Sequence, residues 1–166
     1  MTQSHVSKST RIWPAIDGHT LWTILLAGAM STAAFDLFGQ SLSPILGHAQ
    51  LAPVGLARGV LSTLFGEGTA AQGYLLHYLA GMIGYPIGWM FIFRPVSLTL
   101  APSLPLTVTA VVYGVALWVF ALFFMASLIA GNPPFLGFGD ITWVALVGHI
   151  VFALVTAAVV GWRERS

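Results

Sequence analysis

Two histidines and one aspartate lie inside long apolar stretches of this sequence, where ionisable side chains are rare. His77 and His149 each lie within one such stretch, and Asp36 lies near the end of another. An ionisable group in hydrocarbon costs on the order of 2.5–3.5 kcal/mol on insertion scales, and it normally faces the interior of a helix bundle. These three residues are therefore the candidates for chemistry in this chain.

Several chemistries fit that set. His77 and His149 at matching depth would suit the two axial positions of one haem b. Together with Asp36 they form a set of two nitrogen ligands and one oxygen ligand, which suits zinc or iron. An aspartate and a histidine also form a proton relay. In the structural alternative the same side chains make interhelical hydrogen bonds, worth about 0.6–2 kcal/mol each. The sequence leaves these alternatives open.

The composition places these residues in a membrane protein. Of the 166 residues, 57% are hydrophobic and 7% are charged, whereas about 25% are charged in a typical soluble domain. A soluble globule of this size cannot cover that much apolar surface. The six basic residues are scattered along the chain and form no nucleic-acid patch, so no nucleic-acid partner is expected. The absence of cysteine excludes disulfides, thiolate metal sites, cysteine-held iron–sulfur clusters and covalently attached c-type haem.

The apolar stretches predict the elements that position the three residues. A spanning helix needs about 20 mostly apolar residues, and four segments qualify, at about 20–40, 72–93, 106–130 and 141–162. Spanning strands would alternate in polarity over about ten residues, and these segments do not. The first segment also has features of a secretory signal, but its apolar run continues to Phe38. We therefore predict an all-α, integral membrane four-helix bundle.

The regions outside the spans are more polar. Residues 1–19 are predicted to form an N-terminal tail, and 163–166 the C-terminus. Between the first two spans, Pro53 can start a helix. Apolar side chains then fall on one face of that helix at Ala57, Val60, Leu61 and Leu64. This pattern predicts a short amphipathic helix on the membrane surface.

Basic residues predict the orientation, since cytoplasmic loops carry an excess of lysine and arginine. One side of the predicted membrane holds only Arg58, and the other side holds five basic residues. These are Lys8, Arg11, Arg94, Arg163 and Arg165. Both termini are therefore expected in the cytoplasm, with Asp36, His77 and His149 in the outer half of the bilayer. The second and fourth spans also share a histidine followed by a Gly-Trp pair, which suggests a duplicated helix pair.

Small residues mark the helix faces on which close packing is expected, because they let helix backbones approach each other in lipid. The second span carries Gly81, Gly84 and Gly88 at steps of three and four. Gly28 on the first span and Gly114 on the third are their expected counterparts.

Three stretches together resemble a broad set of small bacterial inner-membrane proteins with four spans. They are "GAMSTAAFDLFGQ" (28–40), "LLHYLAGMIGYPIGW" (75–89) and "VGHIVFALVTAAVVGW" (147–162). The resemblance covers the spans, and it implies a location in the bacterial plasma membrane and no settled activity.

The function expected from these features is that of a structural or accessory subunit of a larger bacterial inner-membrane complex, packed through its Gly and Ala helix faces. The chain has no motif of a serine hydrolase, zinc protease or P-loop enzyme. The alternatives are a one-haem b-type cytochrome or metal-binding membrane protein that uses His77 and His149, and an oligomeric proton or small-solute transporter. The expected partners are the lipid bilayer and other membrane subunits or further copies of this chain.

Overall fold

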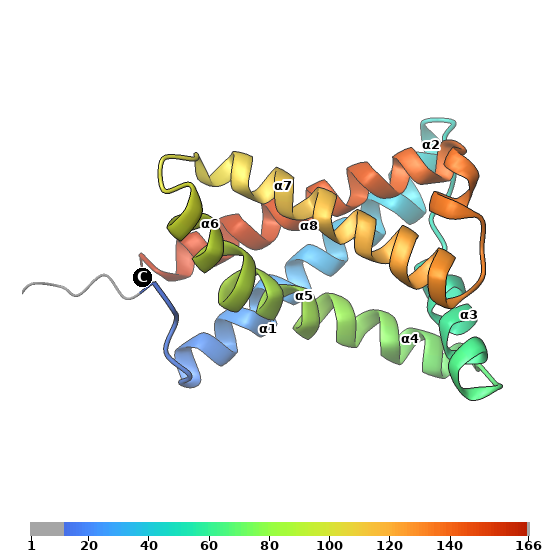
Figure 1. Cartoon of the computed structure of the whole chain (residues 1–166), viewed down its shortest axis with the longest axis horizontal. Coiled ribbons are helices and arrows are strands. Elements are labelled where there is room, and N and C mark those ends of the chain that lie inside the picture. The colour runs from blue at the N-terminus through green and yellow to red at the C-terminus, as the bar shows by residue number, and fades with distance from the viewer. Residues whose placement is uncertain (1–11, 166) are drawn as a thin grey trace, which may run out of the picture.

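The chain is helical throughout the part that the structure describes. The computed structural model describes residues 12–165, and no strand occurs among them. Within that range, four helices are long and apolar enough to cross a membrane. The predicted all-α four-helix bundle is therefore confirmed, and the chain is a multi-pass membrane protein (Figure 1).

Most of the long helices alternate between α-helical and π-helical segments. The first span comprises α1 (Gly18–Asp36), the π-helical η1 (Leu37–Leu42) and α2 (Ser43–Ile45). The second comprises α4 (Ala70–Leu79), η2 (Ala80–Gly84), α5 (Tyr85–Ile87), η3 (Gly88–Phe93) and α6 (Arg94–Leu100). The third comprises α7 (Leu106–Val119) and η4 (Phe120–Ile129), and the fourth is α8 (Asp140–Arg163).

Prolines explain three of the π-helical segments. Pro44, Pro86 and Pro95 each lie in the first turn of the α-helical segment that directly follows η1, η2 or η3. A proline has no N–H and clashes with the carbonyl one turn earlier, so the ladder before it must be rearranged. A wider π turn does this without breaking the helix. As a result, the first span runs to Ile45 and the second to Leu100, beyond the predicted ends at residues 40 and 93.

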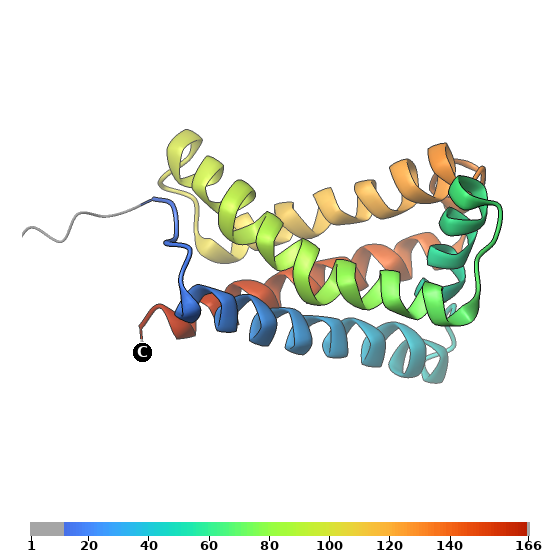
Figure 2. The same ribbon diagram turned by 90° about the horizontal axis from the view of Figure 1, so that it is seen from below.

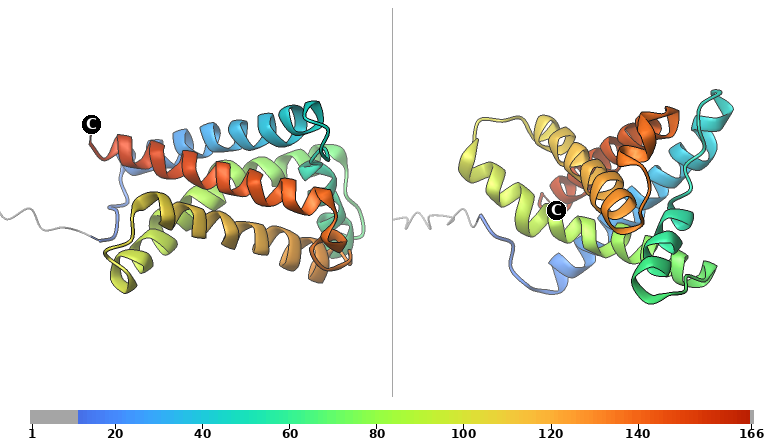
Figure 3. Two further views of the ribbon diagram at one scale, coloured as in Figure 1. Left: turned by 90° about the horizontal axis from the view of Figure 1, so that it is seen from above. Right: turned by 45° about the vertical axis from the view of Figure 1, so that its right-hand side comes forward.

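The spans pack in an order that places α8 at the centre. Figure 3 shows α8 with α1 and α7 alongside it, and the contacts between elements agree. The second span lies across the bundle. It crosses α1 at an angle (Figure 1), and its far end at α6 lies apart from α1 (Figure 2). Its closest approach to α1 is at η2.

The two ends of the bundle differ. One end, called the termini end, holds the start of α1, the end of α8 and the turn between α6 and α7 (Figure 1). The other, called the α3 end, holds α3 (Pro53–Phe65) and the short 3-10 segment η5 (Pro134–Phe138). The half of the bundle beside each end is named accordingly.

The helix predicted after Pro53 is present as α3, which packs against α4 and η4. Ala57 and Val60 are buried against the bundle, but Leu64 on the same predicted face is 55% exposed. The N-terminal part of α3 therefore covers the end of the bundle, and its C-terminal part extends past it. Gly66, with φ of 83°, ends the helix in the left-handed conformation that glycine adopts most easily.

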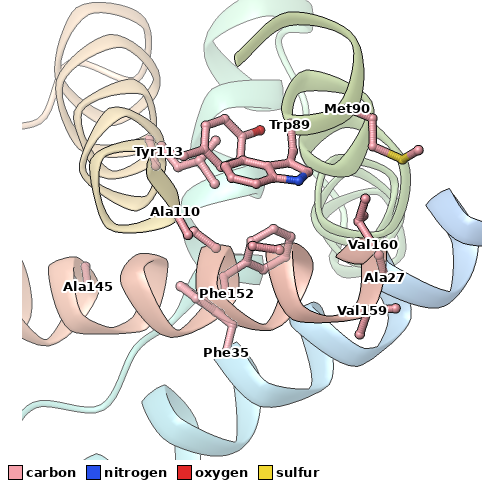
Figure 4. Packing of buried hydrophobic residues seen from close by; sticks show 14 of the residues in the cluster. Ala27, Phe35, Trp89, Met90, Ala110, Tyr113, Ala145, Phe152, Val159 and Val160 are labelled. Carbon is pink, nitrogen blue, oxygen red and sulfur yellow. The ribbon is translucent and has the colours of Figure 1, made fainter. Parts of the chain in front are cut away.

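The core of the termini half is filled by aromatic and small side chains (Figure 4). Trp89 is fully buried, and its ring centroid lies 5.4 Å from that of Tyr113. Phe93 packs against the same tyrosine at 4.9 Å. Ala27, Ala110 and Val160 are buried around them, with exposed fractions of 0–1%. Large rings thus pack against small residues of the neighbouring helices.

Two glycines let helix backbones touch. A Cβ built on Gly28 would lie 2.0 Å from the carbonyl oxygen of Met82, and one on Gly114 would lie 2.6 Å from Cα of Ile150. Gly81 and Gly88 also face neighbouring side chains closely. Gly84 differs, because the nearest atom to its built Cβ is 3.8 Å away. The wide turn of η2 rotates Gly84 off the face that the spacing of three and four residues predicted.

The chain enters the bundle through a capped helix end. The carboxylate of Asp17 accepts a hydrogen bond of 2.9 Å from the backbone N–H of Thr20. This bond lowers the pKa of the Asp17 carboxyl below its ordinary value. Of the predicted tail, residues 1–11 lie outside the described residues. At the other terminus, Arg94 donates through Nη1 and Nη2 to the two carboxylate oxygens of Glu164, which joins α6 to the residue after α8.

Candidate functional site

A cavity of about 180 Å³ lies in the α3 half of the bundle, where all four spans and α3 contribute to its wall. The wall is almost wholly apolar. Its members include Phe35, Leu51, Val60, Ala121, Ala145 and Phe152. An engineered apolar cavity of roughly 150 Å³ stays dry and binds benzene. The space in this protein is therefore sufficient for a molecule with a single ring.

Irregular backbone surrounds the cavity. The π-helical segments η2 and η4 both supply wall residues. No proline follows η4 within the third span, so the explanation that holds for η1, η2 and η3 does not extend to it. π-Helical turns occur frequently at functional sites of proteins. Two of the four π-helical segments within residues 12–165, η2 and η4, thus place irregular backbone in the cavity wall, while η3 lies in the filled termini half.

The turn before α8 also contributes to the wall. Phe135, Leu136 and Phe138 all have φ between 50° and 56°, and Leu136 lines the cavity. Left-handed backbone costs roughly 1–2 kcal/mol for each residue other than glycine. Contacts of Phe135 offset this cost. Its carbonyl accepts a 2.5 Å hydrogen bond from the hydroxyl of Thr142, and its ring centroid lies 4.6 Å from that of Trp118.

Asp36 and His77 are joined directly. Nε2 of His77 lies 3.0 Å and 3.2 Å from the two carboxyl oxygens of Asp36. Because a carboxylate accepts, Nε2 carries the hydrogen and donates it. Gln40, one turn further along the first span, donates a second hydrogen bond of 2.8 Å to Asp36. The two partners come from the first and second spans, so the pair ties these helices together beside the cavity.

His149 makes a different kind of hydrogen bond. Its Nδ1 lies 2.7 Å from the carbonyl oxygen of Ala145, one turn earlier on α8. A carbonyl oxygen only accepts, so Nδ1 must carry a hydrogen. The ring is buried among apolar side chains with 5% of its surface exposed. An unpaired charge is costly in such surroundings, so the ring is neutral and Nε2 presents a lone pair.

Nε2 of His149 has no hydrogen-bond partner among the described residues. It is also absent from the polar atoms that are sealed off without a partner, which in that part of the chain are Oγ1 of Thr32 and Nε1 of Trp89. Nε2 is therefore accessible, and His149 lines the cavity. The lone pair of Nε2 is thus a hydrogen-bond acceptor that faces the cavity.

Thr32 is a second polar side chain of the cavity wall without a partner. It is 3% exposed, and its hydroxyl lies against Gly81, where a built Cβ would be 2.4 Å from Oγ1. Thr32 is not among the site residues predicted from the sequence. The signal that would have found it is its position one helical turn before Asp36, on the same face of the first span.

The hydrogen bonds and positions of the two histidines test whether they can serve as the predicted haem or metal ligands. Nε2 of His77 is engaged by Asp36, and the ring of Phe35 packs against both histidines, at 6.3 Å from His77 and 5.1 Å from His149. The two histidines therefore do not present free Nε2 atoms to one iron. Among residues 12–165, no group of three His, Cys, Asp or Glu side chains is close enough to hold a metal ion. The structure brings Asp36 to His77 and leaves His149 with a separate partner.

Comparisons with known proteins add no relative. No protein-family model, curated protein or solved structure matches this chain. The resemblance to small four-span bacterial membrane proteins therefore stays a prediction.

Proposed function

We propose that this chain is a membrane-embedded binding protein that holds one small, largely apolar molecule in the cavity of the α3 half. The observation that carries the proposal is a space of about 180 Å³ in which the accessible Nε2 of His149 interrupts an apolar wall. Ligand sites are typically concave and mostly apolar, with a few placed polar groups that fix orientation. This cavity has that character on a smaller scale.

The packing of the glycines favours a ligand-binding role over docking to partner subunits through the Gly faces. Gly28 is used against Met82, Gly81 against Thr32, and Gly114 against α8. These small-residue faces are thus occupied within the chain itself. Close packing inside the bundle holds the helices in fixed positions, while the π-helical and left-handed segments leave the space between them.

A titration tests the proposal with a ring-sized probe. The protein in lipid nanodiscs is titrated with 4-fluorotoluene and followed by ¹⁹F NMR, with empty nanodiscs as the reference for partition into lipid. Ala145 is 4% exposed and lines the cavity, so Ala145→Leu fills the space, while Ala158→Leu makes the same change at an exposed site of α8.

Saturable binding is expected in the wild type and in Ala158→Leu, and its loss is expected in Ala145→Leu. If Ala145→Leu does not fold, Ala80→Leu fills the cavity from the second span instead. Equal signals from all proteins and from empty nanodiscs would refute the binding role.

We further propose the bacterial inner membrane as the location, with the termini end in the cytoplasm. Arg94, Arg163 and Arg165 gather at the termini end, whereas Arg58 lies on α3. This distribution supports the orientation because positive residues are retained on the cytoplasmic side.

Single cysteines test the orientation, since the chain has none of its own. Glu67→Cys lies in the exposed connection after α3, and Ser103→Cys lies in the exposed turn between α6 and α7. A membrane-impermeant maleimide added to intact spheroplasts is expected to label the first variant and spare the second. The reverse pattern would invert the topology.

A second candidate role, as an accessory subunit of a larger complex, is favoured by one observation. Where the second span diverges from α1 (Figure 2), Ile92, Val96 and Leu100 form an exposed apolar row at steps of four, with 63%, 44% and 79% of their surfaces exposed. A partner helix would fit this row. A photo-crosslinking residue at position 96 is then expected to give one protein adduct of constant mass in native membranes, and one at Val147 none. Equal adducts at both positions would argue against a partner.

A further inference from the structure

We propose that the ligand of the cavity is a phenol-like molecule, whose hydroxyl group donates a hydrogen bond to Nε2 of His149. This inference rests on the proposed binding function and specifies the chemistry of the ligand. Three observations carry it: the hydrogen-bonding role of Nε2, the aromatic lining of the wall, and the size of the space.

The hydrogen-bonding role follows from the fixed tautomer. Since Nδ1 of His149 donates to the carbonyl of Ala145, Nε2 accepts. A ligand with an O–H group satisfies this acceptor. A carbonyl or ether oxygen brings only lone pairs, so it leaves Nε2 unpaired, and an unpaired buried polar group is unfavourable. Nε2 therefore favours a hydroxyl compound over its ketone or methyl ether.

The aromatic lining favours a ring as the body of that ligand. The ring of Phe35 meets the imidazole of His149 edge to face, at 5.1 Å and 70°. Tyr85 and Phe152 also line the cavity, and their rings meet at 90° with centroids 5.6 Å apart. Rings arranged edge to face leave further edges and faces for a third aromatic ring. The volume of about 180 Å³ admits one ring and its substituent.

Two sources supply such a molecule: a free phenol dissolved in the membrane, and the phenolic head of a lipid-like molecule whose tail stays in the bilayer. Both present the same O–H group on a ring. Competition distinguishes them, because a 4-alkylphenol with a long chain displaces a small phenol only if the tail has a path from the cavity to the lipid.

The test uses three matched probes on the wild-type protein in nanodiscs. 4-Fluorophenol has a donor, 4-fluoroanisole has only an acceptor, and 4-fluorotoluene has neither. After correction for partition into empty nanodiscs, 4-fluorophenol is expected to bind about threefold to tenfold more tightly than the other two, the range of one net hydrogen bond. This comparison needs no variant, so it does not depend on the folding of one.

Two variants then test whether His149 causes the preference for 4-fluorophenol. His149→Phe removes the acceptor and is expected to equalise the three probes while 4-fluorotoluene still binds. His19→Phe, at an exposed histidine of the termini end, is the matched control and should keep the preference. Displacement by 4-dodecylphenol would identify the lipid-like source, and its failure the free phenol.

The outcomes separate the two proposals. Equal binding of all three probes to the wild type, lost in Ala145→Leu, would overturn the phenol assignment and retain the binding function. A preference for 4-fluorophenol that survives His149→Phe would also overturn the assignment. Binding of no probe would refute both proposals.

Discussion

The two halves of the bundle contain similar aromatic residues, but one half is filled and the other holds a cavity. In the termini half, Trp89 is fully buried between Tyr113 and Phe93, and small residues close the remaining space. In the α3 half, rings of similar size, among them Phe35 and Phe152, surround a cavity of about 180 Å³. Aromatic content alone therefore does not decide whether a membrane helix bundle is filled.

Left-handed backbone and polarity distinguish the halves, since the π-helical η3, which contains Trp89, runs through the filled termini half. The cavity is flanked by η2 and η4 and by the left-handed turn that contains Leu136, and it carries the lone pair of His149. Strained or irregular segments persist where surrounding packing maintains them, and they cluster at functional sites. We infer that the termini half supplies most of the stability of the fold. This stability offsets the free-energy cost of the cavity in the α3 half.

The largest expected effect is at the centre of the termini half. Trp89→Ala removes a fully buried side chain, and truncations of this kind cost about 3–5 kcal/mol of unfolding free energy. Trp22 is 68% exposed, so Trp22→Ala serves as the control and should cost far less. Equilibrium unfolding in detergent, with a fixed lipid content, measures the unfolding free energy of both variants. Similar losses would mean that the termini half is not the stable half.

A second effect is expected where the second span crosses α1. Gly28→Ala places a methyl group against the carbonyl of Met82, which is backbone and cannot move aside. The helices must then separate, at a cost of about 1–3 kcal/mol, as for other overpacked sites.

Gly84 supplies the matched control for that change. Its built Cβ meets no atom nearer than 3.8 Å, so Gly84→Ala should be neutral or stabilise by up to about 1 kcal/mol through its helix propensity. Thermal unfolding in the same detergent compares the two. Equal destabilisation by both substitutions would contradict the rotation of Gly84 by η2.

The features predictable from the sequence are those that the bilayer imposes. The spans follow from runs of about 20 apolar residues, and α3 follows from Pro53 and the apolar face after it. The contact between Asp36 and His77 agrees with their predicted shared depth, since two ionisable side chains in hydrocarbon lower their cost by pairing.

The features that escaped prediction depend on local backbone and rotamers. The predicted spans end at residues 40 and 93, before Pro44 and Pro95, because the sequence does not reveal the π turns that let the helices continue through these prolines. His149 bonds to the carbonyl of Ala145 on its own helix, a choice of rotamer that spacing does not determine. The cavity results from several such backbone and rotamer conformations, so no single sequence motif predicts it.

A smaller effect compares two valines of nearly equal burial. Val160 is 1% exposed in the filled half, and Val60 is 2% exposed in the wall of the cavity. Truncation to alanine at Val160 should cost about 1–3 kcal/mol, because each methyl group lost from a filled core costs about 0.5–1.5 kcal/mol. Val60 already lacks neighbours on the side of the cavity, so it has fewer contacts to lose. Val60→Ala is expected to cost less than half as much by the same unfolding assay, and an equal cost would show that the cavity is closed by side-chain movement.

The smallest effect concerns the acidic cap at the termini end. The hydrogen bond from Thr20 lowers the pKa of Asp17 in the folded state below its ordinary value of 3.8. A lowered folded pKa means that the ionised cap stabilises the fold above pH 3.8, and that this stabilisation is lost as the pH falls through the folded value. Asn caps a helix as well as Asp does but does not titrate.

The unfolding midpoint of the wild type should therefore fall relative to that of Asp17→Asn between pH 6 and pH 3, with the two proteins similar at pH 6. Because Asp17 lies on the surface, the difference should shrink in high salt, whereas the contacts around Trp89 should be unaffected by pH and salt alike. Parallel curves for the two proteins would show that the start of α1 does not depend on its cap, and that packing in the termini half alone holds this helix end in place.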